Sequence, residues 1–535
     1  MPPRIVMGLE AELGMLGLPD HPGERELVCR ALADAVARSQ PSAVGGDPKH
    51  AYFVFLANGG AFGPDPPRGM VPEYDTPECL SPFSLAASLT AGMRVVARAA
   101  RAVAAQRATD PGAARLTQLR GELRLVAASM FYQGDDASLG HHENYGVRWP
   151  AGRSHTILHT TLLPWIVTRQ LLTEPGFLSC ADGTRGFGLS PRAPMMERVC
   201  GESTTHARAI FTTGRGAYAR RGWIRLHVIA AGATLSPWAV ALRHGGTALI
   251  LTMVLRGCAL PPALELSNPI VALHQVGRHP TAKIATSGGD ATPLAILSRL
   301  HDWIAEEHRR RPLAPWADRL LAEWRLGLAL AEADIDAGEI WLEYALRRRI
   351  LGLYMAEAGI EWQEVRFWFH FLRLAERFRV PSIELPQTQS GERLRASIRE
   401  EYQPILDERL IQAGRHWNEL PIYRRHLQRL WTLDIELNRI ADGIADRQSA
   451  MRRSVGAEVI SEEAIARAEL EPPDPTRARV RAAMIREHQG DRALGASWDL
   501  VRTSQGKFTL PTPLIRKPKP ARAASLSTPH PVPAQ

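Results

Sequence analysis

Hydrophobic positions in the first 315 residues form short runs that alternate with longer helical patterns. Runs with the length and composition of strands occur at 4–15, 51–60, 122–131 and 225–231. Apolar residues recur at helical spacing at 24–38, 81–108, 159–172 and 235–257. Pro164 is expected near the first turn of the third of these helices. The pattern predicts an α+β unit over residues 1–315.

Helical spacing dominates from residue 316 to about 454, and predicts a largely helical region there. A smaller C-terminal unit is predicted at 455–508. The tail at 509–535 is rich in Pro, Ser and Ala, and is expected to be disordered. No apolar run is long enough to predict a membrane span, because charged residues interrupt the nearest candidate at 244–260.

Two carboxylates, Glu10 and Glu12, interrupt the apolar run of the first predicted strand. Side chains two apart in a strand lie on the same face, so the two acids project together. Burying them unpaired is costly, and a hard divalent cation with oxygen ligands would offset that cost. The alternative is an exposed strand face on which both acids are solvated.

Three further polar clusters follow along the chain. The Gly- and Pro-rich segment 55–79 is predicted to be a loop that carries four acids, Asp65, Glu73, Asp75 and Glu78. Loops at strand ends commonly hold sites, and a solvated surface loop is the alternative. The run "GHHENYGVRW" at 140–149 is dense in polar residues but lacks the spacing of a zinc motif, and a polar hairpin is the alternative. Arg225 and His227 share one face of a predicted strand, where they could meet a phosphate or carboxylate; a half-exposed strand edge is the alternative.

Composition narrows the setting without deciding the chemistry. The formal charge is +9, and nearly all of the 65 basic residues are arginine. A basic surface attracts acidic partners, but no basic-aromatic nucleic-acid signature is present. The 5 cysteines lack disulfide or zinc spacing, and no signal peptide is recognised. We therefore expect a reduced, cytoplasmic setting, with no nucleic-acid or membrane partner.

An ordered series of motifs resembles one family. In order along the chain these are "IVMGLEAELG", "NGG" followed by "PEYDTPEC", "HENY", "LLPWIVTRQLL", "GFGLSPRA", "RLHVI" and "PPDPTRARVR". Each motif is weak alone, but their order is similar to that of the Pup ligase and Pup deamidase/depupylase family, the proteasome accessory factor enzymes.

The resemblance implies a fold similar to glutamine synthetase and the carboxylate-amine ligases, in which an antiparallel sheet backed by helices cradles ATP and Mg²⁺. Ligase members phosphorylate the C-terminal glutamate of the small acidic protein Pup, and a target lysine then forms an isopeptide bond. Other members deamidate a C-terminal glutamine or cleave that bond. The short segment between the first strand and "NG" favours a ligase.

The resemblance also assigns roles to individual residues. Asp65 matches the catalytic aspartate. The nucleotide-binding positions are matched by Thr76, Trp498 and Arg225. The metal-binding positions are matched by Glu10, Glu12, Glu73 and His142.

Two departures from the family pattern affect this prediction. Ala61 and Gly63 stand where the family has an ATP-contacting arginine and a metal-binding tyrosine. An impaired paralogue that binds nucleotide or a Pup-like protein without turnover is therefore an alternative. The helical stretch 362–428 resembles an insertion. Its aromatic run is expected to pack in a helical core, and a docking surface is the alternative.

Overall fold

A computed structural model describes most of the chain. The described residues are 4–16, 22–45, 52–65, 71–109, 123–127, 139–179, 186–203, 207–212, 222–334, 338–362, 364–365, 392–393, 396, 420–515 and 517–520. Nearly all of the predicted insertion at 362–428 lies outside them, including its aromatic run, as does most of the predicted tail. Those predictions, and the predicted domain boundaries, stay predictions.

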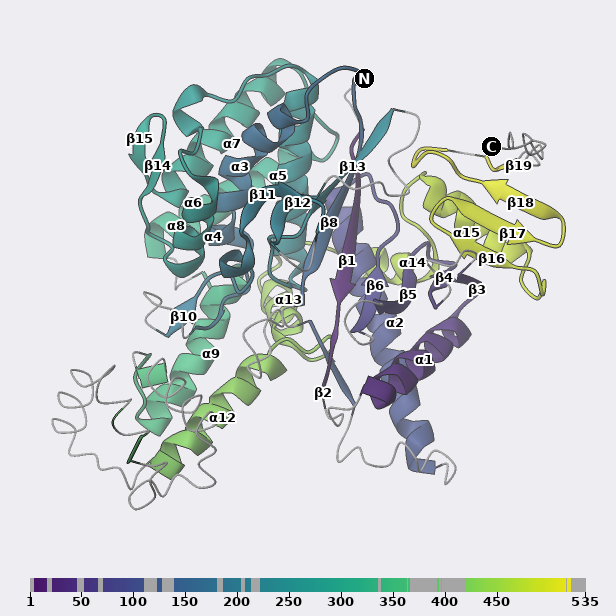
Figure 1. The fold of residues 1–535 in the computed structure, drawn as a ribbon, viewed down its shortest axis with the longest axis horizontal. Helices are drawn as coiled ribbons and strands as arrows, with labels where there is room; N and C mark the ends of the chain where they lie inside the picture. Colours follow the sequence, from purple (N-terminus) through teal and green to yellow (C-terminus); the bar gives the residue numbers. More distant parts are fainter. Residues whose placement is uncertain are drawn as a thin grey trace, which may run out of the picture.

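One mixed sheet organises the fold (Figure 1). In spatial order its strands are β11 (Arg198–Gly201), β12 (Ala209–Thr212), β13 (Trp223–Val228), β8 (His141–Arg148), β1 (Val6–Glu12), β6 (Val71–Asp75), β5 (Ala61–Asp65), β4 (Val54–Leu56), β3 (Ser42–Gly45), β16 (Gly495–Ser497), β17 (Leu500–Thr503), β18 (Gly506–Thr509) and β19 (Lys519–Pro520). Neighbouring strands are antiparallel except for the pairs β11–β12 and β16–β3. The expected antiparallel sheet is thus confirmed.

Three small sheets flank the large one. They pair β2 (Gly14–Leu16) with β7 (Arg124–Val126), β9 (Phe177–Leu178) with β10 (Phe187–Gly188), and β14 (Ile284–Thr286) with β15 (Gly289–Ala291). None of them carries a predicted site residue.

The described helices pack on the sheets and on one another. They are α1 (Pro22–Ser39), α2 (Pro82–Thr109), α3 (Thr156–Thr168), α4 (Gln170–Thr173), α5 (Pro237–Leu255), α6 (Pro269–Arg278), α7 (Pro293–Arg310), α8 (Ala317–Asp334), α9 (Glu343–Ala358), α12 (Leu420–Glu436), α13 (Ile444–Ser454), α14 (Glu462–Leu470) and α15 (Arg477–Glu487), with short 3₁₀ turns η4 (Ala193–Met195) and η5 (Pro262–Leu264). In Figure 1 the group α3–α8 and the C-terminal strands lie on opposite sides of β1.

The main core lies between the sheet and these helices. Leu9 and Ala11 of β1 alternate with its carboxylates and are buried, together with Tyr74 and Phe62 on the neighbouring strands. Helix α2 packs directly on β1 and against α5. This period-2 division leaves the opposite face of β1 free for polar chemistry.

Helix α5 is the described helix long and apolar enough to cross a membrane, but 94% of its apolar window is buried inside the fold. Arg243 and His244 lie within it, both fully buried. Arg243 donates to the Gly232 carbonyl at 2.9 Å and pairs with Glu174. The helix is therefore a core element whose charged residues are paired internally.

Two local predictions differ from the structure. The described part of the segment 55–79 is not a single loop, because Ala61–Asp65 and Val71–Asp75 form β5 and β6, joined to β4 and β1 by regular antiparallel ladders. Pro164 lies in the interior of α3, since that helix begins at Thr156 and not near residue 159. In the first case tertiary pairing overrides the low strand propensity of Gly and Pro.

Candidate active site

The register of the central strands places polar side chains in rows on one sheet face. Across β5, β6, β1 and β8, one row contains Ala61, Asp75, Glu10 and His142. The next row contains Gly63, Glu73 and Glu12. Directly opposed residues in antiparallel strands point to the same side. Segments more than 130 residues apart in sequence therefore share one face.

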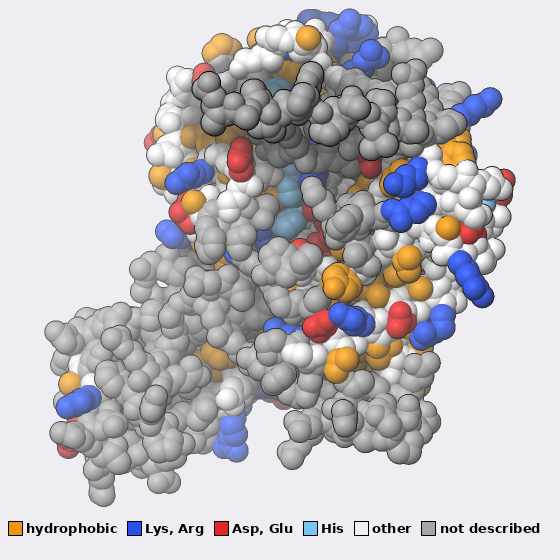
Figure 2. All heavy atoms as spheres, turned by 45° about the vertical axis from the view of Figure 1, so that its right-hand side comes forward, with side chains coloured by type: hydrophobic (Ala, Val, Ile, Leu, Met, Phe, Trp, Pro, Cys, Tyr) orange, Lys and Arg blue, Asp and Glu red, His pale blue; other side chains and the backbone are white. Residues whose placement is uncertain are grey.

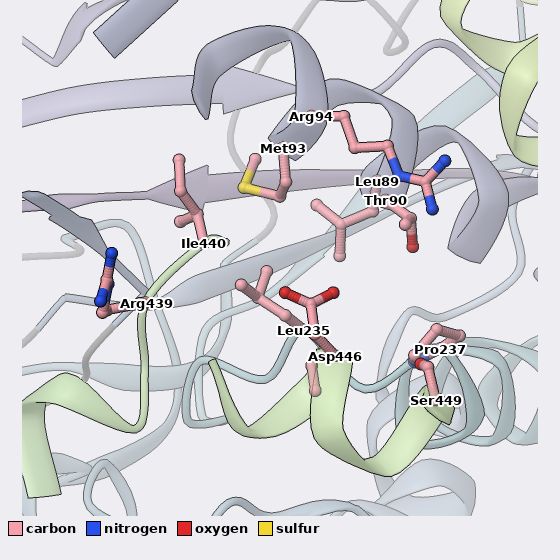
Figure 3. A pocket seen from close by; sticks show the side chains of 11 residues that line it. Leu89, Thr90, Met93, Arg94, Leu235, Pro237, Arg439, Ile440, Asp446 and Ser449 are labelled. Atoms are coloured by element: carbon pink, nitrogen blue, oxygen red, sulfur yellow. The ribbon is translucent and has the colours of Figure 1, made fainter. Parts of the chain in front are cut away.

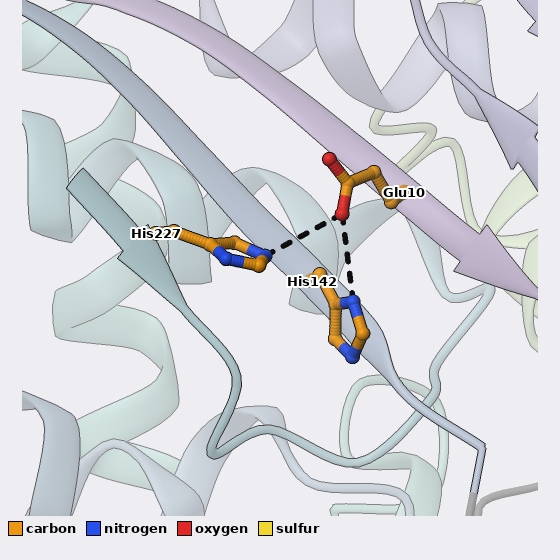
Figure 4. A group of neighbouring side chains, drawn as sticks. All are labelled: Glu10, His142 and His227. Carbon is orange, nitrogen blue, oxygen red and sulfur yellow. Dashed lines mark ion pairs between the residues drawn. The ribbon is translucent and has the colours of Figure 1, made fainter. Parts of the chain in front are cut away.

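Glu10 is the centre of a group that extends over β8 and β13 (Figure 4). Its Oε2 lies 3.4 Å from His142 Nδ1 and 3.4 Å from His227 Nε2. Its Oε1 accepts hydrogen bonds from Arg225 at 2.6 Å and from Asn144 at 3.0 Å. Burial alone would raise the pKa of Glu10, but the charge of Arg225 and the histidine hydrogen bonds hold it well below its usual value. Glu10 is thus ionised.

A second group consists of Glu12, Asp65 and Glu73. One carboxylate oxygen from each lies within 4.8 Å of the other two. Glu12 Oε2 also accepts a hydrogen bond from the Gly140 N–H at 2.6 Å. Burial, followed by the charge of Asp75 and then of Glu10, raises the pKa of Glu73 well above its usual value. An all-oxygen donor set under mutual repulsion fits a hard divalent cation.

The structure rejects the alternative of a solvated strand face. Glu12 and Glu73 are buried, at 6% and 9% exposure, and Glu10 is half-buried. Figure 2 shows histidine and acidic side chains gathered in a recess in the middle of the face that it presents. Carboxylates this close and this enclosed require compensating positive charge.

Sequence reasoning included Asp75 and Asn144 in candidate clusters but assigned neither of them a role. Asp75 is opposite Glu10 and 5% exposed, and burial together with the charge of Glu10 raises its pKa well above its usual value. Asn144 donates to Glu10 and accepts from Arg225 Nε at 2.6 Å. The signal was present, because each lies two residues from a predicted site residue, Glu73 or His142, but it required reading both segments as strands.

The "HENY" segment divides between two faces of β8. His142 and Asn144 face the carboxylates, whereas Glu143 and Tyr145 are buried on the core side. There Glu143 Oε2 accepts hydrogen bonds from Tyr145 at 2.5 Å and from Arg169 at 2.9 Å. Half of this motif therefore serves the core.

Two residues predicted to bind nucleotide lie in different surroundings. Thr76 follows β6, and its Oγ1 accepts a hydrogen bond from the Leu9 N–H at 2.9 Å, which extends the pairing of β6 with β1. Trp498 is half-buried at the end of β16, with its ring 5.4 Å from that of Phe55. The guanidinium of Arg481 lies 4.9 Å from the Trp498 ring centroid. No described contact joins either residue to the carboxylates.

The structure gives a physical reason for the departure at Gly63. A Cβ built on Gly63 would lie 2.7 Å from Phe53 Cγ and 2.9 Å from Phe53 Cα. The Phe53 ring, which is 7% exposed, therefore occupies the space that a side chain at position 63 would need. Ala61 is fully buried beside Asp75 and presents only a methyl group.

A separate pocket lies between α2, α13 and the segments at 235–237 and 439–440 (Figure 3). Its polar members include Arg94, Asp446 and Ser449. Arg94 is already paired with Glu462 at 2.8 Å, and burial raises the pKa of Asp446. The pocket contains none of the predicted site residues.

Comparison with known proteins identifies the family. The family model described as Pup-ligase protein matches residues 6–372 and 405–502. The chain belongs to this family. The matched region contains every predicted site residue, and it leaves out the two termini and part of the predicted insertion.

The names of individual relatives include both activities of the family. A Pup deamidase/depupylase of Mycolicibacterium smegmatis is 31% identical over 333 residues, which are 61% of this chain and 63% of that protein. A Pup–protein ligase of Kocuria rhizophila is 28% identical over 387 residues, covering 67% and 76%. The chain thus aligns with less than two thirds of the length of the first of these relatives.

A solved structure confirms the fold. The crystal structure of the complex between Pup and its ligase PafA matches with a TM-score of 0.70 at 19% identity, over 96% of this chain and 90% of that one. The predicted α+β architecture of the family is therefore correct.

Proposed function

We propose that this protein is an ATP- and Mg²⁺-dependent ligase that joins the C-terminal glutamate of a small acidic, Pup-like protein to a lysine of a target protein. The observation that carries the proposal is the enclosed group of Glu12, Asp65 and Glu73 beside Glu10. The family membership gives this group its chemistry.

A carboxylate is a poor acyl donor, because it has no good leaving group. Phosphorylation from ATP supplies one, and a bound divalent cation shields the phosphate charges during transfer. Glu10, Glu12, Glu73 and His142 would hold such cations through their oxygen and nitrogen atoms, within the groups that already place these atoms close together. The enclosed face limits competing hydrolysis by water.

The remaining residues would bind and orient the reactants. Arg225 is the cation within hydrogen-bond reach of Glu10, and its guanidinium is suited to a phosphate or carboxylate oxygen. Trp498 offers a ring face to the nucleotide base. Asp65, half-buried at the end of β5, would accept the proton that the attacking lysine must lose.

Hydrolysis of a C-terminal amide or isopeptide bond is the second candidate function. The 31% identity to a deamidase/depupylase favours it. The same acidic residues would then activate water in place of an amine.

An impaired paralogue is the third candidate, because the residues at positions 61 and 63 lack side chains that could bind nucleotide or metal.

One assay separates these functions. Purified protein is incubated with ATP, MgCl₂, a lysine-bearing target and Pup-like protein ending in Glu or in Gln. Conjugates are followed by gel shift, ADP by coupled assay and ammonia by a glutamate dehydrogenase readout. Asp65→Asn should abolish turnover, whereas Asp290→Asn, on exposed β15, is the matched control and should leave turnover unchanged.

Conjugate and ADP with the Glu-ended protein support the ligase. Ammonia from the Gln-ended protein without conjugate would replace it by the deamidase. ADP binding without turnover in either arm would support the impaired paralogue and refute both the ligase and the deamidase.

A further inference from the structure

Asp75 has no role in the family-based prediction, yet it lies where the two acidic groups meet. It is directly opposite Glu10 on β1 and two residues from Glu73 on its own strand, so all three project from the same face. Directly opposed Cβ atoms in such ladders are about 4.5–5.5 Å apart, which brings carboxylate ends within reach of a shared cation. Asp75 therefore joins the Glu10 group to the Glu73 group.

One oxygen of the Asp75 carboxylate lacks a protein partner, although the side chain also makes a hydrogen bond with Glu73. The side chain is 5% exposed, and its Oδ1 has no hydrogen-bond partner among the described residues. On the β5 side it faces Ala61, whose methyl group donates nothing. Buried polar oxygens are almost always paired, and an unpaired one in a native fold marks a place for a ligand, water or ion.

The surplus negative charge on this face also favours binding of a cation. Five carboxylates, those of Glu10, Glu12, Asp65, Glu73 and Asp75, occupy adjacent rows of the three strands β1, β5 and β6. Within the part of the face that the structure describes, Arg225 is the guanidinium paired with them, and it contacts Glu10. One arginine does not balance five acids, and leaving the surplus buried is expensive.

We propose that Asp75 is a metal ligand of this protein, and binds a hard divalent cation together with Glu10 and Glu73. This inference takes from the proposed function only the class of cation. Mg²⁺ and Mn²⁺ both belong to that class, since both favour carboxylate oxygens. Asp75 adds an oxygen donor at a site whose neighbouring positions 61 and 63 supply none.

Mn²⁺ binding to the purified full-length chain tests this assignment without any activity measurement. Bound Mn²⁺ is counted by electron paramagnetic resonance, and the unfolding temperature is recorded in EDTA and in MnCl₂. Asp75→Asn keeps the shape of the side chain and removes its charge. It should weaken Mn²⁺ binding at one site by at least about tenfold, a loss already typical of residues that only support metal ligands.

The same variant should be at least as stable as the natural protein in EDTA, because it relieves repulsion, and should gain less stability from MnCl₂. Asp474→Asn is the matched control, since Asp474 is a half-buried aspartate outside the sheet face that accepts a hydrogen bond from Leu80 N–H at 2.8 Å. That variant should lose stability in EDTA and bind Mn²⁺ normally.

If Asp75→Asn instead lowers stability in EDTA and binds Mn²⁺ like the natural protein, Asp75 is a structural residue and the assignment is wrong. Absence of conjugation by a protein whose Mn²⁺ binding depends on Asp75 would refute the proposed ligase activity alone. The two proposals therefore fail separately.

Discussion

Substituting Glu78 by Gln is expected to destabilise the protein more than removing either of its arginine partners. Glu78 is fully buried and serves two fully buried guanidinium groups. Its Oε1 accepts from Arg477 Nε at 2.5 Å, and its Oε2 lies 3.3 Å from Arg481 Nη2. Burial would raise the pKa of Glu78, but the charges of the two arginines lower it, so the group is ionised.

The expected magnitudes follow from how many charges each variant leaves uncompensated. Removing one partner of a buried ion pair costs about 3–5 kcal/mol. Arg481→Met leaves Glu78 paired with Arg477, which places its cost near the lower limit, about 3 kcal/mol. Glu78→Gln removes the carboxylate that both arginines share and turns an amide N–H₂ towards their donors, so we expect about 5 kcal/mol or more.

Urea unfolding followed by tryptophan fluorescence gives both values from the midpoint and slope. Glu462→Gln is the control, because Glu462 pairs with Arg94 at the surface, with side chains 52% and 39% exposed, and should cost under about 1 kcal/mol. A Glu78→Gln variant as stable as Arg481→Met would show that the two arginines do not depend on one carboxylate, and would refute the reasoning.

Three further outcomes are expected around the carboxylate face. The raised pKa values of Glu73 and Asp75 mean that the folded protein keeps protons that the unfolded chain releases above the usual values of 4.5 and 3.8. The stability that these retained protons contribute is therefore lost as pH rises. The difference in unfolding temperature between MgCl₂ and EDTA should widen from pH 5 to pH 8. A constant difference would contradict this prediction. Gly63→Ala should lower the free energy of unfolding by about 1–3 kcal/mol, because the added methyl group overpacks against Phe53. Combining it with Phe53→Leu should recover part of that loss in urea unfolding. If the losses of the two variants simply add, the clash is contradicted. Trp498→Leu should weaken ADP binding by about tenfold, as loss of base stacking predicts, and calorimetry that gives an unchanged Kd would exclude the ring from the nucleotide site.

Local periodicity was sufficient for part of the site. Alternation along the first strand placed Glu10 and Glu12 on one face, and the register with β6 and β8 confirms it. The same reasoning put Arg225 and His227 together on β13. A period of two is a property of the extended backbone itself, so it needs no knowledge of neighbouring strands.

The segment between β4 and α2 could not be read in this way. Its Gly, Pro and Asp residues are typical of a loop, yet β5 and β6 pair with each other and with β1. Ladder pairing with distant strands and the buried Phe53 ring stabilise these strands, and neither is visible within a local window. Asp75 was one of the four acids in the predicted loop, but it was given no role for that reason.

By itself the sequence determined which side chains share a face within each strand and, through its ordered motifs, which family the chain belongs to. Only the tertiary structure decided that faces from β5, β6, β1, β8 and β13 meet in one register. It also decided which groups surround each buried carboxylate: burial and neighbouring acids move the pKa of Glu73 up, whereas Arg225 and the two histidines move that of Glu10 down. Burial and proximity between distant segments set those shifts, because a charge responds to its solvent and to its neighbours in space, and not to its neighbours along the chain.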